Sequence, residues 1–336
     1  MTSGQRLWDP LGAFDDPVAT GIAIALALLL LVTPLIIVGL RAAGRTEPEH
    51  HRELMARYYS WVVLVPILVI PVLLGAAAAL TLVCALSLLC YREYARATGL
   101  FRSRSIYFLV ALGILCVTFA SLDHYYSLFV ALGPMAVTVI ASVAVLLNRP
   151  DGYVKRVALA ALGFVVFGMW FGHLGFIVND SNYRAIMLWL FVCVELNDVF
   201  AYISGKLFGR HQLCSNTSPN KTVEGALGAL VLTTGLVATL GHFVFRGQPI
   251  DTIGHLIALG IIISAGGQFG DLILSSIKRD IGIKDMGATI PGHGGFLDRF
   301  DSLVIVSPVL FHFINYFQGV GVDQATNIIT GPFASG

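Results

Sequence analysis

Long runs of apolar residues alternate with short polar segments along most of the chain. Each run holds 15 to 25 residues, close to the roughly 20 residues that an α-helix needs to cross a bilayer. The pattern predicts an all-α integral membrane protein with about ten transmembrane helices. They are expected at residues 18–40, 61–75, 76–91, 105–121, 127–147, 157–178, 185–205, 224–245, 252–276 and 303–317.

The apolar segment 61–91 has two interpretations, because Pro71 and Gly75 fall inside its 31 residues. It forms either one long kinked helix or two short helices joined by a tight turn at Gly75. Positive charge favours two helices, since the loops then alternate between charge-rich and charge-poor. The rich set holds 18 of the 21 Lys and Arg, in segments 41–60, 92–104, 148–156, 206–223 and 277–301. Cytoplasmic loops collect Lys and Arg, so this set is expected in the cytoplasm and both termini outside.

The composition agrees with a membrane protein. Hydrophobic residues make up 56% of the chain and charged residues 12%, about half the charged fraction of a soluble domain. The mean hydropathy is +0.80. A net charge of +1 gives no electrostatic reason to expect a nucleic-acid partner, and the sequence leaves a homodimer open.

Polar residues break the apolar pattern first in segment 194–230. Glu195, Asp198 and Tyr202 share one face of the helix predicted at 185–205. A carboxylate inside a membrane is costly, so it marks either a functional site or a structural ion pair. Lys221 follows in a polar loop, where it either binds a substrate or only contributes to the positive cytoplasmic face. Thr222 or Thr217 could simply cap a turn.

The second polar segment, 271–301, lies at the cytoplasmic end of the next predicted helices. Asp271, Ser275 and Lys278 are spaced for one helical face. A glycine-rich loop follows them, and glycines let backbone N–H groups approach a ligand. The loop and the residues after it carry further polar groups, namely Lys284, Asp285, His293, Asp298, Arg299 and Asp301.

These residue types suit phosphoryl or nucleotidyl transfer. Such reactions need a divalent metal and Lys or Arg to neutralise phosphate oxygens, and aspartate oxygens favour Mg²⁺. The sequence has no P-loop motif and no G-x-G-x-x-G fingerprint. His293 is either a general base or a loop or phosphate contact; the second role is favoured, because a substrate phosphate needs no strong base near neutral pH.

The segment "SIKRDIGIKDMGATIPGHGGFLDRFD" at 276–301 closely resembles the C-terminal motif of the phosphatidate cytidylyltransferases, or CDP-diacylglycerol synthases. The segments "NDVFAYISGKLFGR" and "SPNKTVEG" resemble two further blocks of that family. The resemblance covers about 61–317. It divides the chain into an N-terminal tail, extra span and basic loop at 1–60, a cytidylyltransferase-like membrane domain at 61–318, and a tail at 319–336.

The resemblance implies transfer of a cytidylyl group from CTP to phosphatidic acid, with Mg²⁺ as cofactor and the site at the cytoplasmic ends of the C-terminal helices. The metal would be held by Asp271, Asp298 and Asp301, and these three with Lys278 and Arg279 form the predicted catalytic set. The predicted substrate-binding set is Asn197, Asp198, Tyr202, Ser218, Lys221, Lys284, Asp285, His293 and Arg299.

The chain departs from the family where Asn220 and Val223 replace a common Lys and Trp, which leaves the nucleotide and lipid preference open. A lysophosphatidate or an isoprenoid phosphate is an alternative acceptor. A CTP-dependent lipid kinase of the polyprenol type is the alternative enzyme. A transporter is disfavoured, because the charges gather at one face and no repeat is visible.

Overall fold

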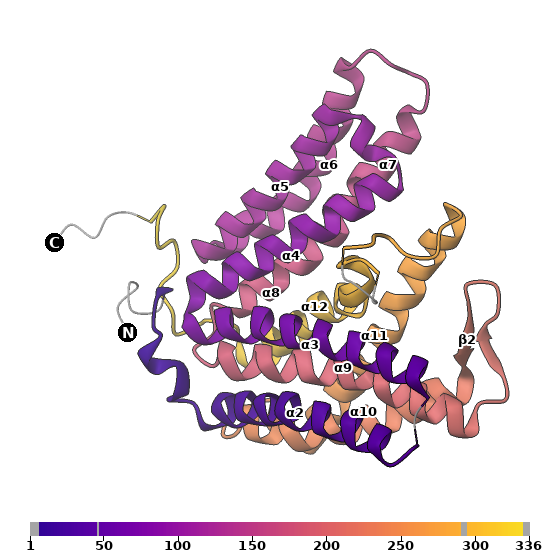
Figure 1. Ribbon diagram of the computed structural model, residues 1–336. Helices are drawn as coiled ribbons and strands as arrows, with labels where there is room; N and C mark the ends of the chain where they lie inside the picture. Colours follow the sequence, from indigo (N-terminus) through magenta and orange to yellow (C-terminus); the bar gives the residue numbers. More distant parts are fainter. Residues whose placement is uncertain (1–6, 46, 290–293, 332–336) are drawn as a thin grey trace.

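The computed structural model describes residues 7–45, 47–289 and 294–331 (Figure 1). Within these residues, ten helices are long and apolar enough to cross a membrane, which confirms the predicted number. Nine of them are α2 (Pro17–Ala42), α3 (Pro48–Leu74), α4 (Ala76–Ala97), α5 (Arg104–Leu122), α6 (Tyr126–Leu146), α9 (Tyr183–Phe208), α10 (Val223–Val244), α11 (Ile253–Asp280) and α12 (Leu297–Gln318). The tenth is one continuous span made of α7 (Tyr153–Gly163), the π-helical segment η3 (Phe164–Trp170) and α8 (Phe171–Ile177).

The predicted break at Gly75 is confirmed. Gly75 separates α3 from α4 and has a φ of 141°, a region that residues with a side chain rarely adopt. A Cβ atom at this position would lie 2.7 Å from the carbonyl oxygen of Leu7. The N-terminal segment therefore packs directly on the turn, and the short 3₁₀-helix η1 (Leu11–Phe14) leads from there into α2.

Several helices extend beyond the apolar segments that predicted them. The last helix was expected to begin at 303 but begins at Leu297, and α3 begins at Pro48 rather than at 61. Hydropathy marks only the part of a helix inside the hydrocarbon, whereas Glu, Arg and Lys are good helix formers that continue a helix into water. The change at α12 matters most, because it places Asp298 and Asp301 on a helix.

Two features were not predicted. The polar loop after α9 contains an antiparallel hairpin of β1 (Gln212–Cys214) and β2 (Ser218–Thr222), in which Gln212 pairs with Thr222. Thr222 ends the hairpin and caps α10, because its Oγ1 accepts a hydrogen bond from Gly225 N at 3.1 Å. A second short 3₁₀-helix, η2 (Leu100–Arg102), turns the chain between α4 and α5.

The helices form two groups that share a continuous apolar core. Figure 1 shows α4, α5, α6 and α7 as an arm that extends away from the group containing α9 to α12. In this second group α10 packs against α9 and α11, and α11 packs against α12. The first span, α2, packs against α3 and α9. The arm and the adjoining α8 meet the second group along α12, which contacts both α4 and α8.

Candidate active site

The main polar pocket lies between the hairpin and the ends of α9, α10, α11 and α12, and its volume is about 760 Å³. Eleven of the fourteen residues predicted for the site line this pocket. They are Asp198, Tyr202, Ser218, Lys221, Asp271, Lys278, Lys284, Asp285, Asp298, Arg299 and Asp301. Two polar segments that are far apart in the sequence therefore form one site.

An ion pair joins the hairpin to α11 across the pocket. Lys221 Nζ lies 2.5 Å from Asp271 Oδ2, and the two side chains are only 22% and 24% exposed. Ser275, one turn further along α11, donates a hydrogen bond to Asp271 Oδ1 at 3.1 Å. Lys221 is held in position because β2 ends directly at the first turn of α10. It thus has a specific partner, which a contribution to loop charge alone would not require.

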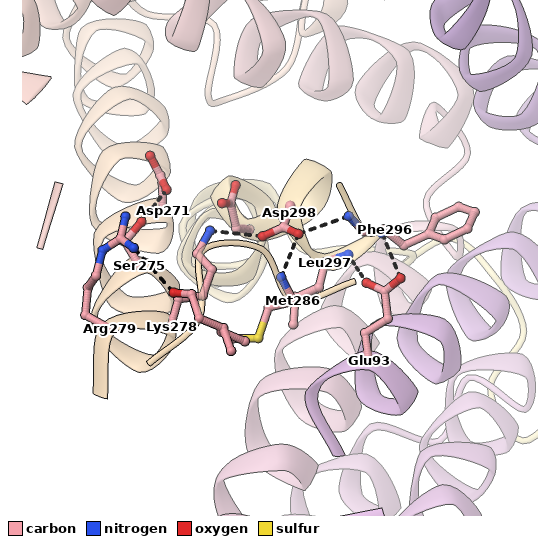
Figure 2. Close-up of polar contacts among 12 residues, drawn as sticks. Glu93, Asp271, Ser275, Lys278, Arg279, Met286, Phe296, Leu297 and Asp298 are labelled. Atoms are coloured by element: carbon pink, nitrogen blue, oxygen red, sulfur yellow. Dashed lines mark hydrogen bonds and ion pairs between the residues drawn. The ribbon is translucent and has the colours of Figure 1, made fainter. Parts of the chain in front are cut away.

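A second and deeper ion pair joins α11 to α12. Lys278 Nζ lies 2.9 Å from Asp298 Oδ1, with the side chains 10% and 6% exposed. The other oxygen, Asp298 Oδ2, accepts hydrogen bonds from Met286 N at 2.9 Å and Gly295 N at 3.0 Å. Figure 2 shows Asp298 at the centre of these contacts. Asp298 thereby holds both described parts of the 281–296 loop, and it also lines the pocket.

Two more carboxylates, Asp198 on α9 and Asp301 on α12, converge near Ser302. Ser302 Oγ donates a hydrogen bond to Asp198 Oδ2 at 3.4 Å, and Asp301 Oδ1 accepts one from Ser302 N at 2.8 Å. The close approach of α11 and α12 depends on Gly270, because a Cβ there would collide with the carbonyl oxygen of Asp301. Gly270 therefore lets Asp271 and Asp301 face the same pocket.

The pocket is electrically balanced, with five basic and five acidic side chains in its lining. One of the basic residues, Lys206, was not predicted from the sequence. Its Nζ lies 5.9 Å from the centre of the Tyr202 ring. Arg299 keeps a buried Nε atom without a hydrogen-bond partner among the described residues. This combination of anions and cations suits a ligand that is itself a metal–polyphosphate complex.

Carboxylate oxygens in this pocket are the donors that Mg²⁺ prefers. In the described part of the chain, no three acidic, His or Cys side chains gather into a preformed metal site. This arrangement still fits Mg²⁺, which is usually bound by one or two carboxylates together with water and substrate phosphates. All three predicted ligands already have partners. Asp298 is engaged by Lys278 and two backbone amides, Asp271 by Lys221 and Ser275, and Asp301 by Ser302.

Two predicted site residues lie elsewhere, and a third, His293, lies outside the described residues. Arg279 does not line the pocket. Its Nε donates a hydrogen bond to Thr217 O at 3.2 Å and its Nη1 to Ile283 O at 3.3 Å. Arg279 therefore links the hairpin turn to the end of α11.

Asn197 also points away from the pocket. It is fully buried, and its Oδ1 accepts hydrogen bonds from Thr233 at 3.0 Å and Ser264 at 2.7 Å. Its side chain thus joins α9 to α10 and α11, behind the site. These contacts point to a role in helix packing, whereas the sequence suggested substrate binding.

We expect Asn197→Ala to lower stability without changing substrate affinity. Two buried hydroxyl groups would lose their acceptor, which costs about 1–3 kcal/mol. Thermal unfolding in detergent should show a lower midpoint, while the KM for each substrate stays within about twofold. Ser218→Ala, which alters a hydroxyl that does line the pocket, is the comparison variant. A raised KM in Asn197→Ala with unchanged stability would contradict the packing role.

Glu93, a buried residue on α4, was not predicted from the sequence. It lies outside the pocket and contacts the start of α12 (Figure 2). Its Oε1 accepts hydrogen bonds from Thr289 Oγ1 at 2.5 Å and Phe296 N at 3.1 Å, and its Oε2 accepts one from Leu297 N at 2.9 Å. A carboxylate at a helix N-terminus stabilises the free amides there. Glu93 thus fixes the start of α12, immediately before Asp298.

A profile of the cytidylyltransferase family matches residues 55–317, which include every element of the pocket. The chain belongs to the cytidylyltransferase family. This result confirms the family resemblance seen in the sequence.

Individual relatives agree with this family. A protein of Escherichia coli strain K12 named "Uncharacterized protein YnbB" is 32% identical over 243 residues, covering 70% of this chain and 79% of the relative. The phosphatidate cytidylyltransferase of Staphylococcus haemolyticus is 42% identical over 139 residues, covering 41% and 52%. That of Staphylococcus saprophyticus is 46% identical over 124 residues, covering 37% and 46%. The chain therefore spans about half the length of these two cytidylyltransferases.

Proposed function

We propose that this protein transfers the cytidylyl group of CTP to phosphatidic acid, giving CDP-diacylglycerol and pyrophosphate for phospholipid synthesis. The observation that carries this proposal is the balanced pocket, with its Lys221–Asp271 and Lys278–Asp298 pairs, in a chain of the cytidylyltransferase family. The names of the two staphylococcal relatives support phosphatidate as the acceptor.

In the proposed reaction, an oxygen of the lipid phosphate attacks the α-phosphorus of CTP. A new P–O bond forms there, the bond to the β-phosphate bridging oxygen breaks, and pyrophosphate leaves with those electrons. A phosphate monoester is already largely deprotonated near pH 7, so no strong base is required. The protein's task is then to bind, orient and neutralise the two phosphate-bearing substrates.

The basic residues of the pocket suit this task. Lys221 reaches the pocket from the hairpin and Lys278 from α11. Arg299 also lines the pocket, and its buried Nε atom has no hydrogen-bond partner among the described residues. These side chains would hold the phosphates in line for attack. We propose that Asp271 and Asp301 hold Mg²⁺, with Asp298 nearby, and the bound ion would neutralise charge on the phosphate oxygens. Tyr202 and Lys206 extend the pocket along α9, where the outer part of a substrate would lie.

We also infer that the pocket faces the cytoplasm and that both termini lie on the other side. The loops that hold 18 of the 21 Lys and Arg alternate with loops that hold few, and the pocket-forming hairpin and the 281–296 loop belong to the rich set. CTP would enter from the water. Phosphatidic acid would enter from the membrane interface, at the depth of the helix ends.

Purified protein in detergent, given phosphatidic acid, labelled CTP and Mg²⁺, should form a lipid-soluble cytidine product and release an equal amount of pyrophosphate. Chelation of Mg²⁺ should stop both, because the phosphate charge would no longer be neutralised. Release of CDP in the presence of a lipid alcohol would instead identify a kinase that transfers the γ-phosphoryl group. An absence of turnover with every lipid phosphate would contradict the proposal.

A further inference from the structure

A second polar pocket lies where the α4–α5 corner meets the α6–α7 loop, with a volume of about 310 Å³. Four cationic side chains line it, Arg102 from the first corner and Arg149, Lys155 and Arg156 from the second. We call this site the basic pocket. It shares no lining residue with the active-site pocket, and the proposed reaction does not use it.

The charge of the basic pocket is not neutralised by the protein. In the described part of the chain, none of the four cations forms an ion pair with a carboxylate. The one acidic residue in the two corners, Asp151, is exposed and contributes no lining. Arg156 is held instead by backbone, since its guanidinium donates hydrogen bonds to the carbonyl oxygens of Arg149 and Asp151. The pocket is therefore a formed cavity with an unbalanced positive charge.

The backbone adds to this field. Ser103 and Gly152, the residues before α5 and α7, also line the pocket, and neither provides a side-chain cap for its helix. The first N–H groups of a helix carry partial positive charge. The two helix starts therefore reinforce the attraction that the four cations exert on an anion.

The remaining lining indicates which anion the pocket takes. The partly exposed Leu147 and Leu159 supply apolar surface beside the cations, which suits lipid chains better than a free phosphate ion. Successive spans place this corner at the same face of the molecule as the hairpin and the 281–296 loop. Cationic pockets between helices at this face are suited to lipid headgroups. We propose that the basic pocket binds the phosphate group of an anionic phospholipid, as a lipid site separate from the active site.

The test is lipid binding by the full-length protein, measured by native mass spectrometry during titration with phosphatidylglycerol or phosphatidylcholine. The wild type should bind phosphatidylglycerol more tightly than phosphatidylcholine. The double variant Arg102→Gln/Lys155→Gln should weaken phosphatidylglycerol binding about tenfold or more, since each basic residue at a membrane surface contributes about 1 kcal/mol. The matched control is Arg41→Gln/Arg52→Gln, which removes two exposed charges outside the pocket and should change binding less than twofold.

Three results would overturn the proposal. The first is a wild type without preference between the two lipids. The second is equal weakening of binding in both double variants, which would indicate general surface charge. Displacement of the bound lipid by inorganic phosphate or CTP at equal concentration would indicate a site for free anions. Because binding is measured without turnover, failure of the proposed cytidylyl transfer would leave this result unaffected.

Discussion

Asp271→Asn is expected to lower formation of the cytidine lipid at least about a hundredfold, while the protein remains folded in the membrane. Asn has nearly the same shape as Asp but no charge, so Lys221 would lose its partner at 2.5 Å and the proposed Mg²⁺ would lose a ligand. Loss of one group that stabilises transition-state charge typically costs about 10²–10³ in rate. The measurement is single-turnover formation of labelled lipid from CTP, with thermal unfolding in detergent as the check on folding.

The matched control is Asp280→Asn, which removes an exposed carboxylate from the same helix outside the pocket. It should retain at least about half of the wild-type activity. Asp298→Asn should also abolish turnover, but with a lower unfolding midpoint, because it releases Met286 and Gly295 as well as Lys278. Full activity in Asp271→Asn would contradict the metal and phosphate role of this pocket.

The number and order of the helices could be predicted because few kinds of backbone structure can cross a bilayer. Each span must satisfy its own backbone hydrogen bonds and must be long enough to cross, and the charge pattern resolved the break at Gly75. The start of α12 and the hairpin could not be predicted in the same way. Both lie in polar segments outside the apolar runs, where hydropathy does not distinguish a helix end or a short strand from a loop.

The members of the site could be predicted better than their contacts. Lys221 and Asp271 were both identified, but their pairing across 50 positions depends on the packing of α10 against α11. Asn197 and Asp198 show that two adjacent residues of one helix can have different roles. Neighbours on a helix point about 100° apart, so Asp198 faces the pocket while Asn197 faces Thr233 and Ser264.

Glu93 was missed for a related reason. It lies among Arg92, Tyr94 and Arg96 at the end of α4, a context that indicates only a helix end at the cytoplasmic face. Its partners come about 200 residues later in the chain. No local pattern connects them, because the contact exists only once the arm packs against α12.

Glu93→Gln is expected to lower kcat about tenfold or more with little change in KM for CTP. Glu93 does not line the pocket, so it acts as a positioning residue. Both carboxylate oxygens of Glu93 accept hydrogen bonds. The Gln side chain has an NH₂ group in place of one oxygen, and this group would face a hydrogen-bond donor. A buried polar group would then be left unpaired, at a cost of about 1–3 kcal/mol. The start of α12 would loosen and Asp298 and Arg299 would lose their fixed positions. Steady-state kinetics and amide hydrogen exchange over residues 294–301 measure the two effects.

Two glycines offer an independent way to break the same contact. A Cβ at Gly287 would lie 2.7 Å from Glu93 Oε1, and a Cβ at Gly295 would collide with Oε2, so Gly295→Ala should push the carboxylate away. Because both changes break one contact, the double variant Glu93→Gln/Gly295→Ala should be no slower than the slower single variant. Glu49→Gln, an exposed residue on α3, is the control and should behave as the wild type. Additive losses in the double variant, or normal exchange and kcat in Glu93→Gln, would show that Glu93 does not position the start of α12.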